Sequence, residues 1–198
     1  MLQGKFGEAS NEIIIEEMLV GEEVSVIINQ LLNCSALCFT DGTTVVNMPL
    51  VQDHKRLLDG DQGPNTGGMG VVAPVLHFGA AIWEQIEEIC KRTIEALREN
   101  GICYKGVLYA GLIVTAKGVQ VLEYNCRFGD PETEVLMRLL NSDLYQILLA
   151  CCEGTLEQTS VQWSSNYACG VVLAASGYPL NYPKGNTITG KWSTNVTE

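Results

Sequence analysis

Two apolar, β-prone runs separated by a Lys117-Gly118 turn constrain the fold of this chain more than any other feature. Residues 106–115 and 119–124 predict a β-hairpin, because such runs on either side of a glycine-containing turn favour paired strands. An amphipathic pattern over residues 80–100 predicts a helix that packs on the hairpin. Its stripe recurs at helical spacing and consists of Ile82, Ile86, Ile89, Thr93 and Leu97. We therefore expect an α+β protein with a mixed or antiparallel sheet and packed helices.

The second strand of this hairpin ends in polar residues that suit a metal ion. Side chains alternate across a strand, so Val121, Glu123 and Asn125 are expected on one face. Carboxylate and amide oxygens suit Mg²⁺, which completes its octahedron with water and phosphate. Arg127 follows, and Asp130-Pro131 predicts a helix with Asp as N-cap and Pro in the first position. A metal, a guanidinium and a helix N-terminus favour phosphate binding. The alternative is a buried strand whose Glu meets a Lys.

The composition of the chain indicates which kinds of binding partner it is expected to have. The formal net charge is −11 and the pI is near 4.6, so the chain lacks the basic character of a nucleic-acid binder. The eight cysteines form no CxxC pair and several lie in apolar runs, which is typical of a reduced, cytoplasmic protein. No apolar run of about 18 residues and no basic-then-apolar leader occur, so neither a membrane span nor a signal peptide is predicted.

An acidic segment near the start of the chain has the residue types that a nucleotide requires. The apolar run 13–15 predicts a buried strand, and Glu16, Leu19 and Glu23 follow it. A base needs main-chain donors and acceptors beside an apolar wall, and a ribose needs a carboxylate that accepts from its hydroxyl groups. A solvated acidic turn is the alternative, and for this segment alone it is the better interpretation.

Three segments between residues 41 and 70 carry clear local signals. Asp41-Gly42 predicts a hairpin turn, with 43–48 as the returning strand. Residues 52–56 (QDHKR) are the one basic cluster of the sequence, and such clusters usually cover a loop that leads to a helix. Residues 63–70 contain four glycines and are predicted to hold no regular structure, although their backbone can approach a ligand closely. A mobile lid and a plain flexible loop explain this composition equally well.

Two more helices are predicted after the metal-type motif. They are expected at residues 131–140 and 143–152. The second has Ser142 as its candidate N-cap and Gly154 as its end.

Seven motifs occur in an order and at spacings that resemble one known family: IIIEEMLVGEE, QDHKRLL, GPNTGGMG, GVLYAGLIVT, VLEYNCRFGDPE, NSDLYQIL and GYPLNYPKG. Together they are similar to phosphoribosylamine–glycine ligase (glycinamide ribonucleotide synthetase), a family of the ATP-grasp superfamily. The resemblance covers nearly all of residues 12–190, and NCRFGDPE with QDHKR and GPNTGGMG makes it specific. It implies a fold that holds ATP between two α+β subdomains, followed by a small β-rich domain.

The resemblance also implies an activity. Members of the family ligate glycine to 5-phosphoribosylamine with ATP, through a glycyl phosphate, in purine biosynthesis. The substrates would be these small molecules, with no nucleic acid and no membrane, and the resemblance allows other purine-pathway domains in a longer chain. It places Asp53, Gly67 and Gly68 around the substrates and assigns Arg127 a catalytic role.

The same resemblance implies sites for ATP and a divalent metal. Glu16 and the backbone of Leu19 would contact the adenine edge, and Glu23 would accept from the ribose hydroxyl groups. Glu123 and Asn125 would hold Mg²⁺, or Mn²⁺ in its place, against the terminal phosphates.

The expected domain organisation combines this resemblance with the local patterns. Residues 1–18 would end the smaller ATP-grasp subdomain and form the hinge, and 19–154 would form the larger subdomain. Residues 155–166 are polar and linker-like. The apolar run 167–175 predicts a new strand, and because a lone strand cannot bury itself, 167–198 would begin the C-terminal domain.

Two departures from the family pattern bear on function. By this resemblance, the lysines that reach the ATP phosphates in the family would lie in the part of the smaller subdomain that the resemblance does not cover, so we expect the isolated chain to turn over its substrates negligibly. Roughly ten extra residues around 26–36 interrupt an expected strand and predict a bulge or an exposed excursion. The alternative functions are a non-catalytic fragment that retains an adenine and metal half-site, and another ATP-grasp carboxylate–amine ligase.

Overall fold

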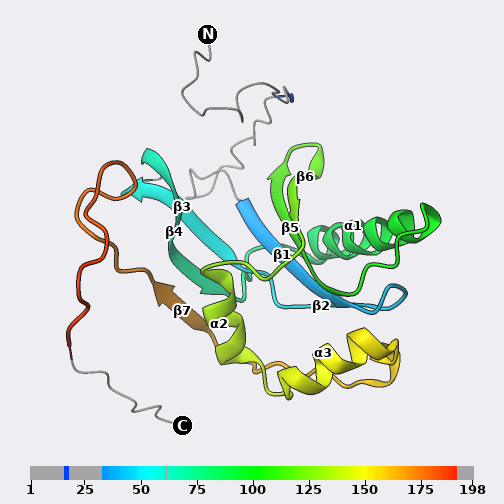
Figure 1. The fold of residues 1–198 in the computed structure, drawn as a ribbon. Helices are drawn as coiled ribbons and strands as arrows, with labels where there is room; N and C mark the ends of the chain where they lie inside the picture. Colours follow the sequence, from blue (N-terminus) through cyan, green and yellow to red (C-terminus); the bar gives the residue numbers. More distant parts are fainter. Residues whose placement is uncertain (1–15, 18–32, 61, 191–198) are drawn as a thin grey trace.

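The computed structural model describes residues 16–17, 33–60 and 62–190, which build two antiparallel sheets with helices packed around them (Figure 1). The first sheet has the order β2-β1-β5-β6, with β1 (Asn33–Thr40), β2 (Val45–Asn47), β5 (Gly106–Thr115) and β6 (Gly118–Asn125). The second has the order β3-β4-β7, with β3 (Gln52–Leu58), β4 (Gln62–Ala73) and β7 (Ala168–Val171). The helices are α1 (Ala80–Glu99), α2 (Glu132–Leu139) and α3 (Leu144–Glu153), and a 3-10 turn spans Leu156–Gln158. The α+β class is confirmed.

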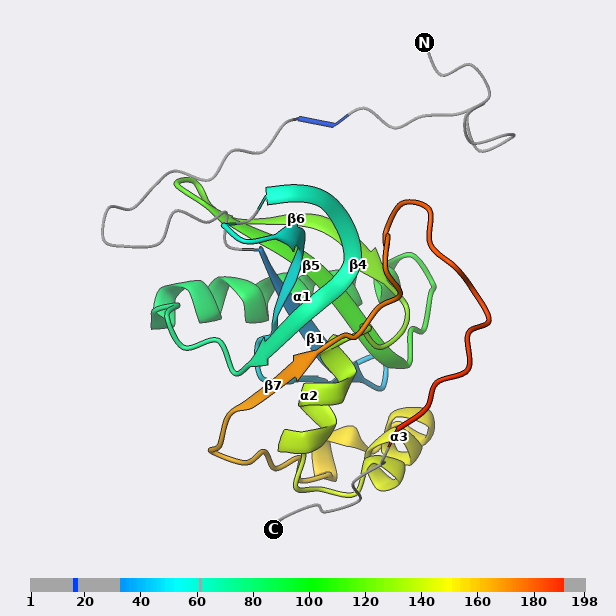
Figure 2. The ribbon, with the colours of Figure 1, turned by 90° about the vertical axis from the view of Figure 1, so that its left-hand side faces the viewer.

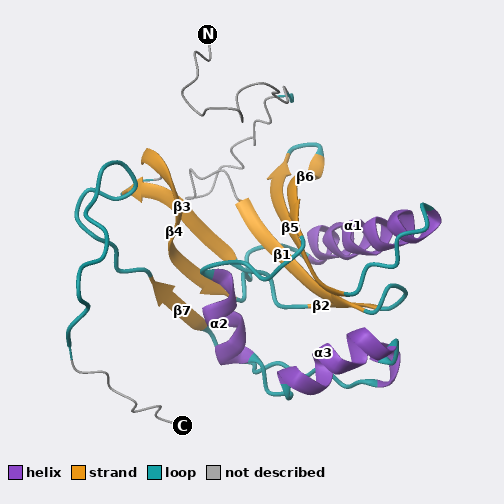
Figure 3. Ribbon diagram, in the orientation of Figure 1, coloured by secondary structure: helices purple, strands orange, loops and turns teal. Residues whose placement is uncertain are grey.

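The two central strands of the first sheet, β1 and β5, are buried on both faces, which explains their continuous apolar runs. Leu37 and Phe39 of β1 face a core that includes residues of β4, α2 and α3. Ala36 and Cys38 face a second core that α1 covers. The alternation follows from the two-residue period of a strand. Figure 3 shows the same layers, with α1 on one side of β5 and β6 and the second sheet on the other.

The predicted helix 80–100 and the hairpin of β5 and β6 are both confirmed. Ile86 is 1% exposed, and Cys90 and Ile94 are buried with it. Ile82 and Ile89 are partly buried at the margin of this contact. The buried face of α1 therefore includes Cys90 and Ile94, each one residue beyond the predicted Ile89 and Thr93.

The caps of the two short helices differ from the prediction. Pro131 occupies the N-cap position of α2 and has no side-chain acceptor, so the expected cap by Asp130 is wrong. At α3, Oδ1 of Asp143 accepts from the backbone N–H of Tyr145 over 2.8 Å, so Asp143 replaces Ser142 as the cap. The expected end at Gly154 is confirmed, since this residue has the left-handed φ of 78° that glycine tolerates.

The basic cluster and the glycine-rich segment form strands, which corrects two predictions. QDHKRLL is β3, and GPNTGGMG lies inside the long strand β4. Figure 2 shows how strongly β4 curves over the first sheet. The register of β3 against β4 shifts twice, between His54 and Arg56 and again before Leu58. Glycines permit such irregular pairing, because Gly63 and Gly68 have φ values of 82° and 120°.

A β-bulge changes the faces of β6. Gly111 pairs with Glu123 and Leu112 pairs with Val121, so Leu122 is the extra residue. Val121 and Tyr124 consequently line a groove beside α1, and the Tyr124 hydroxyl lies 2.8 Å from Oγ1 of Thr93. The expectation that Val121 shares a face with Glu123 is wrong, because the bulge breaks the alternation.

Part of the segment that was predicted to interrupt a strand, residues 33–36, forms regular β-structure. Asn33 pairs with Ile113 and Ala36 with Ala110, so an excursion is wrong for 33–36. These residues form backbone pairs with β5, and Cys34, Ser35 and Ala36 are buried. Residues 26–32 lie outside the described part of the chain.

The segment 155–166 packs against the rest of the fold. Leu156 is 1% exposed, and Trp163 forms a β-bridge with Leu140. The strand predicted at 167–175 is confirmed as the shorter β7, which pairs with β4. The division into domains stays a prediction. Across the described ranges, no helix combines the length and the apolar character needed to cross a membrane.

Candidate functional site

A cavity opens where the two sheets meet. Ser35 donates its backbone N–H to the carbonyl of Val51 over 2.8 Å and accepts from the N–H of Val51 over 3.1 Å. Val51 directly precedes β3, so this bridge brings the start of β3 against β1. The cavity has a volume of about 270 Å³ and is lined by residues of β1, β3, β4, β5 and β6.

The side chains of the basic cluster lie on two opposite faces of β3. Asp53 and Lys55 line the cavity, whereas His54 and Arg56 are exposed. The two-residue period of the strand explains this division. The QDHKR motif therefore contributes one acid and one cation to the site, rather than a uniformly solvated surface.

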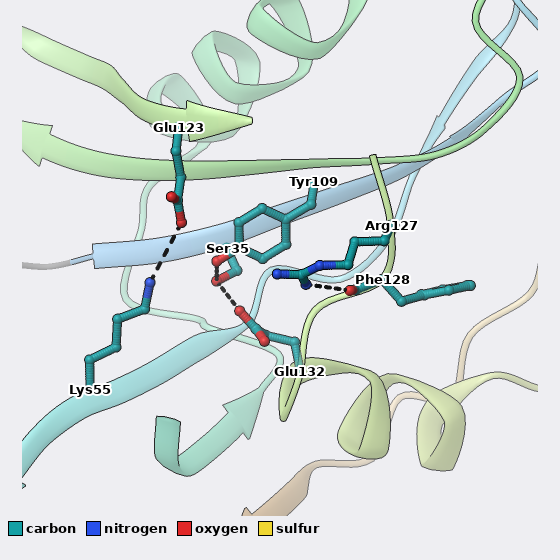
Figure 4. Close-up of polar contacts among 7 residues, drawn as sticks. All are labelled: Ser35, Lys55, Tyr109, Glu123, Arg127, Phe128 and Glu132. Atoms are coloured by element: carbon teal, nitrogen blue, oxygen red, sulfur yellow. Dashed lines mark hydrogen bonds and ion pairs between the residues drawn. The ribbon is translucent and has the colours of Figure 1, made fainter. Parts of the chain in front are cut away.

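Glu123 faces this cavity from β6, with Asn125 on the same side of the strand. The Lys55 ammonium lies 3.9 Å from Oε1 of Glu123, and both side chains are partly solvated, with 39% and 54% exposure (Figure 4). Such an open ion pair contributes little stability, so the Glu123 carboxylate remains available to a ligand. Asn125 pairs with Tyr109, whose side chain also lines the cavity.

These two residues fit a divalent metal ion that is completed by other ligands. A partly solvated carboxylate and an amide oxygen are hard donors of the kind that Mg²⁺ accepts. Within residues 33–60 and 62–190, no group of three or more His, Cys, Asp or Glu side chains converges as a metal site. The donor set of Glu123 and Asn125 thus suits an ion that keeps water and phosphate ligands.

Asp53 is the most perturbed carboxyl group of the site. It is 8% exposed, and its Oδ1 atom has no hydrogen-bond partner among the described residues. Burial, followed by the negative charge of Glu132, raises its pKa from 3.8 to about 7. Lys55 opposes this rise, and Asp130 adds to it. Asp53 is therefore easily protonated near neutral pH.

Glu132 is a site residue that sequence reasoning missed. It is 2% exposed, and its Oε1 accepts a 2.7 Å hydrogen bond from the Ser35 hydroxyl. That hydroxyl lies 3.0 Å from the Tyr109 hydroxyl (Figure 4). Glu132 is also the first residue of α2. The N-terminus of this helix therefore carries a buried carboxylate, and the expectation that it binds phosphate stays a prediction.

The two glycines assigned to the substrate have different surroundings. A Cβ on Gly68 would meet Pro131 and lie 2.7 Å from Oδ1 of Asp53, so only glycine fits against this carboxyl group. Gly67 is exposed, and its N–H donates to the Tyr178 hydroxyl over 2.7 Å. Gly68 therefore lies against Asp53, whereas Gly67 contacts the loop that contains Tyr178.

Arg127 and Glu16 are not among the described residues that line the cavity. Arg127 is exposed on the loop from β6 to α2, and its guanidinium donates to the carbonyl of Phe128 over 2.8 Å (Figure 4). Glu16 is exposed. Leu19 and Glu23 lie outside the described residues.

Three polar residues of the site carried weak sequence signals. Ser35 and Tyr109 lie inside apolar runs, where their hydroxyl groups resemble ordinary strand substitutions. Glu132 directly follows the Asp130-Pro131 turn, and a helix-starting acid is usually solvated. The signal that was available is its position in the specific motif NCRFGDPE.

Comparisons with known proteins show which family the chain is similar to. The family described as phosphoribosylglycinamide synthetase, ATP-grasp (A) domain, matches residues 1–133. The trifunctional purine biosynthetic protein adenosine-3 of Bos taurus is 49% identical over 193 residues, which cover 96% of this chain and 18% of that protein. The phosphoribosylamine–glycine ligase of Synechocystis is 48% identical over 188 residues, covering 93% of this chain and 42% of that protein.

A solved structure shows the same fold. The phosphoribosylamine–glycine ligase of Thermotoga maritima superimposes with a TM-score of 0.71 at 38% identity, over 83% of this chain and 39% of that one. The family match and the shared fold thus define an ATP-grasp type of domain. More particularly, the chain belongs to the phosphoribosylglycinamide synthetase family. It spans less than half the length of these relatives.

Proposed function

We propose that this chain forms part of the active site of an ATP-dependent ligase that joins glycine to 5-phosphoribosylamine and yields glycinamide ribonucleotide, ADP and phosphate. The observation that supports it is the convergence of Glu123, Lys55 and Asp53 on one cavity, in a chain of this family. The name of the Synechocystis relative supports the same reaction. Glycine and phosphoribosylamine would be the substrates, and the cytoplasm the compartment of a purine biosynthetic enzyme.

The residues of the site would have separate roles in this reaction. Glu123 and Asn125 would hold Mg²⁺, or Mn²⁺, which when bound neutralises charge on the ATP phosphates. In the first step the carboxylate of glycine attacks the γ-phosphate and forms glycyl phosphate and ADP. Lys55, on the cavity wall, would add positive charge near these oxygens. In the second step the amine of phosphoribosylamine attacks the carbonyl carbon of glycyl phosphate, the bond from this carbon to the phosphate oxygen breaks, and the nitrogen loses a proton.

The other assignments follow the family resemblance. Glu16 and the backbone of Leu19 would bind the adenine edge, and Glu23 would bind the ribose. Asp53 and Gly68 would face a substrate, and Arg127 would turn toward the phosphates when they are bound. Glycyl phosphate hydrolyses in water, so closure of the site would protect this intermediate.

The test is ADP release that depends on both glycine and phosphoribosylamine, measured in a complete chain that contains these residues. We expect Glu123→Ala to abolish turnover and to leave the unfolding transition nearly unchanged, because this side chain is 54% exposed. Glu134→Ala is the matched control, since Glu134 is an exposed glutamate of α2 away from the cavity. Full turnover by the Glu123 variant would refute the proposed site.

A further inference from the structure

One buried carboxyl group, Asp53, lines the cavity, and a second, Glu132, lies behind Ser35, which also lines it. Glu132 of α2 accepts a hydrogen bond from the Ser35 hydroxyl over 2.7 Å. Asp53 of β3 lines the cavity, is 8% exposed and has an Oδ1 atom without a partner in the described part of the chain. A buried polar atom without a partner is costly, so this acceptor on a residue of the cavity wall indicates a donor that the described residues do not supply.

The hydrogen bonds around Glu132 have a defined direction. A serine hydroxyl carries one proton, and Ser35 donates it to Glu132. The 3.0 Å contact between the Ser35 and Tyr109 hydroxyls must therefore be donated by Tyr109. Burial raises the pKa of the Tyr109 phenol above its usual range, so this donor keeps its proton at neutral pH. The relay from Tyr109 through Ser35 ends on Glu132 and stabilises a negative charge there.

The other charged groups near Asp53 do not neutralise it. Lys55 lies on the same strand, but its ammonium is 3.9 Å from Glu123. Asp130, which precedes α2, adds a further negative charge. Arg127 directs a guanidinium N–H to the carbonyl of Phe128. Acids thus outnumber the cations that face Asp53.

Two neighbouring buried carboxyl groups cannot both ionise without a strong electrostatic penalty. We propose that Asp53 and Glu132 share a single negative charge, that the Tyr109–Ser35 relay keeps this charge on Glu132, and that Asp53 gives up its proton when a primary ammonium group enters the cavity. In that step the O–H bond of the Asp53 carboxylic acid breaks and its proton passes to the buffer. The ammonium keeps its three N–H groups and donates to the resulting carboxylate.

A primary ammonium group fits these surroundings better than a neutral donor. It offers three N–H donors and a positive charge, and it forms a charge-assisted bond with a carboxylate. The binding part of this inference rests on the proposed function, because glycine carries such a group. The shared charge does not depend on it. Glu132 is a positioning residue in this scheme, since it acts through Asp53.

The shared charge is tested by NMR titration of carboxyl-labelled aspartate in the 198-residue chain, with the Asp53 signal identified by its loss in Asp53→Asn. We expect the Asp53 signal to titrate near pH 7, in accord with its raised pKa. Glu132→Gln removes the neighbouring charge and should lower this midpoint by about one pH unit. Glu134→Gln, on the exposed side of α2, is the matched control and should leave it unchanged.

Ser35→Ala provides an independent test of the relay. Without the Ser35 donor, Glu132 holds its charge less well and takes up the shared proton, so the Asp53 midpoint should also fall. Rescue by Ser35→Thr, which restores the hydroxyl group, is expected. An Asp53 midpoint near 4 in the wild-type chain, or one that neither Glu132→Gln nor Ser35→Ala moves, overturns the shared charge.

Ligands then test the ammonium step in the same chain. A ligand that binds the ionised form lowers the midpoint by about one pH unit at ten times its Kd. We expect glycine and methylammonium to lower the Asp53 midpoint, and acetate, which lacks the ammonium group, to leave it unchanged. A response to methylammonium but not to glycine supports the cation subsite and counts against the proposed substrate. No response to either overturns the ammonium step, whereas the Glu132→Gln result stands by itself.

Discussion

Replacement of Asp53 by asparagine should stabilise the protein, and the gain should depend on pH. The pKa of Asp53 rises from 3.8 to about 7 on folding, because burial and Glu132 disfavour the charged form. The folded state therefore binds more protons than the unfolded state between about pH 4 and pH 7. Stability contributed by this group falls as pH rises through that window.

The size of the effect follows from the two pKa values. Each pH unit of difference corresponds to about 1.4 kcal/mol, so a difference of about three units costs the folded state about 4 kcal/mol at pH 8. At pH 5 the same relation yields a cost of about 2 kcal/mol, since the folded-state carboxyl group is then protonated. Asparagine has nearly the same shape and does not ionise. Asp53→Asn should therefore increase the free energy of unfolding more at pH 8 than at pH 5, by about 2 kcal/mol.

The assay is urea unfolding at pH 5 and pH 8, followed by circular dichroism, for the wild type and the variant. Asp59→Asn is the matched control, because Asp59 is an exposed acid in the turn after β3 and should change stability little at either pH. An equal gain at both pH values would show that packing, not ionisation, dominates. A loss of stability at pH 8 would refute the argument that Asp53 is a strained acid.

This prediction links the site to its proposed role. A functional site tolerates an unfavourable buried group when that group meets its partner in the ligand. Asp53→Asn should thus combine a more stable fold with weaker binding of an ammonium ligand. A variant that gains stability and keeps full affinity would separate the two properties.

Two further predictions concern the fold. Asp41 is buried, which raises its pKa, but the backbone N–H groups of Thr44, Thr43 and Leu156 lower it to a net depressed value. Asp41→Asn should cost about 1–3 kcal/mol in urea unfolding at pH 7, and the difference should shrink in acid, where the wild type loses its charge; a constant difference would contradict this. Leu136 of α2 is fully buried, so Leu136→Ala should cost about 2–5 kcal/mol, whereas Met137→Ala at the margin of the core should cost less. Equal costs would contradict the orientation of α2, in which Leu136 is buried and Met137 lies at the margin of the core.

Local sequence pattern determined the parts of this protein that are built from near neighbours. The helix at α1, the hairpin of β5 and β6, and the glycine end of α3 were all predictable. Each depends on periodicity or on a turn residue within one short segment. The presentation of Glu123 and Asn125 at the end of one strand was predictable for the same reason.

Tertiary structure decided the features that depend on distant partners. GPNTGGMG became part of β4 because β3 pairs with it and β7 pairs with β4 from Gly70 onward, and glycines by themselves carry no strand signal. The bulge at Leu122 depends on the register against β5, which no property of β6 alone specifies. Glu132 is buried because Ser35, 97 residues away, supplies its donor. The charge arrangement around Asp53 therefore arises only when both sheets and α2 meet, since buried charges depend on neighbours that the local sequence does not contain.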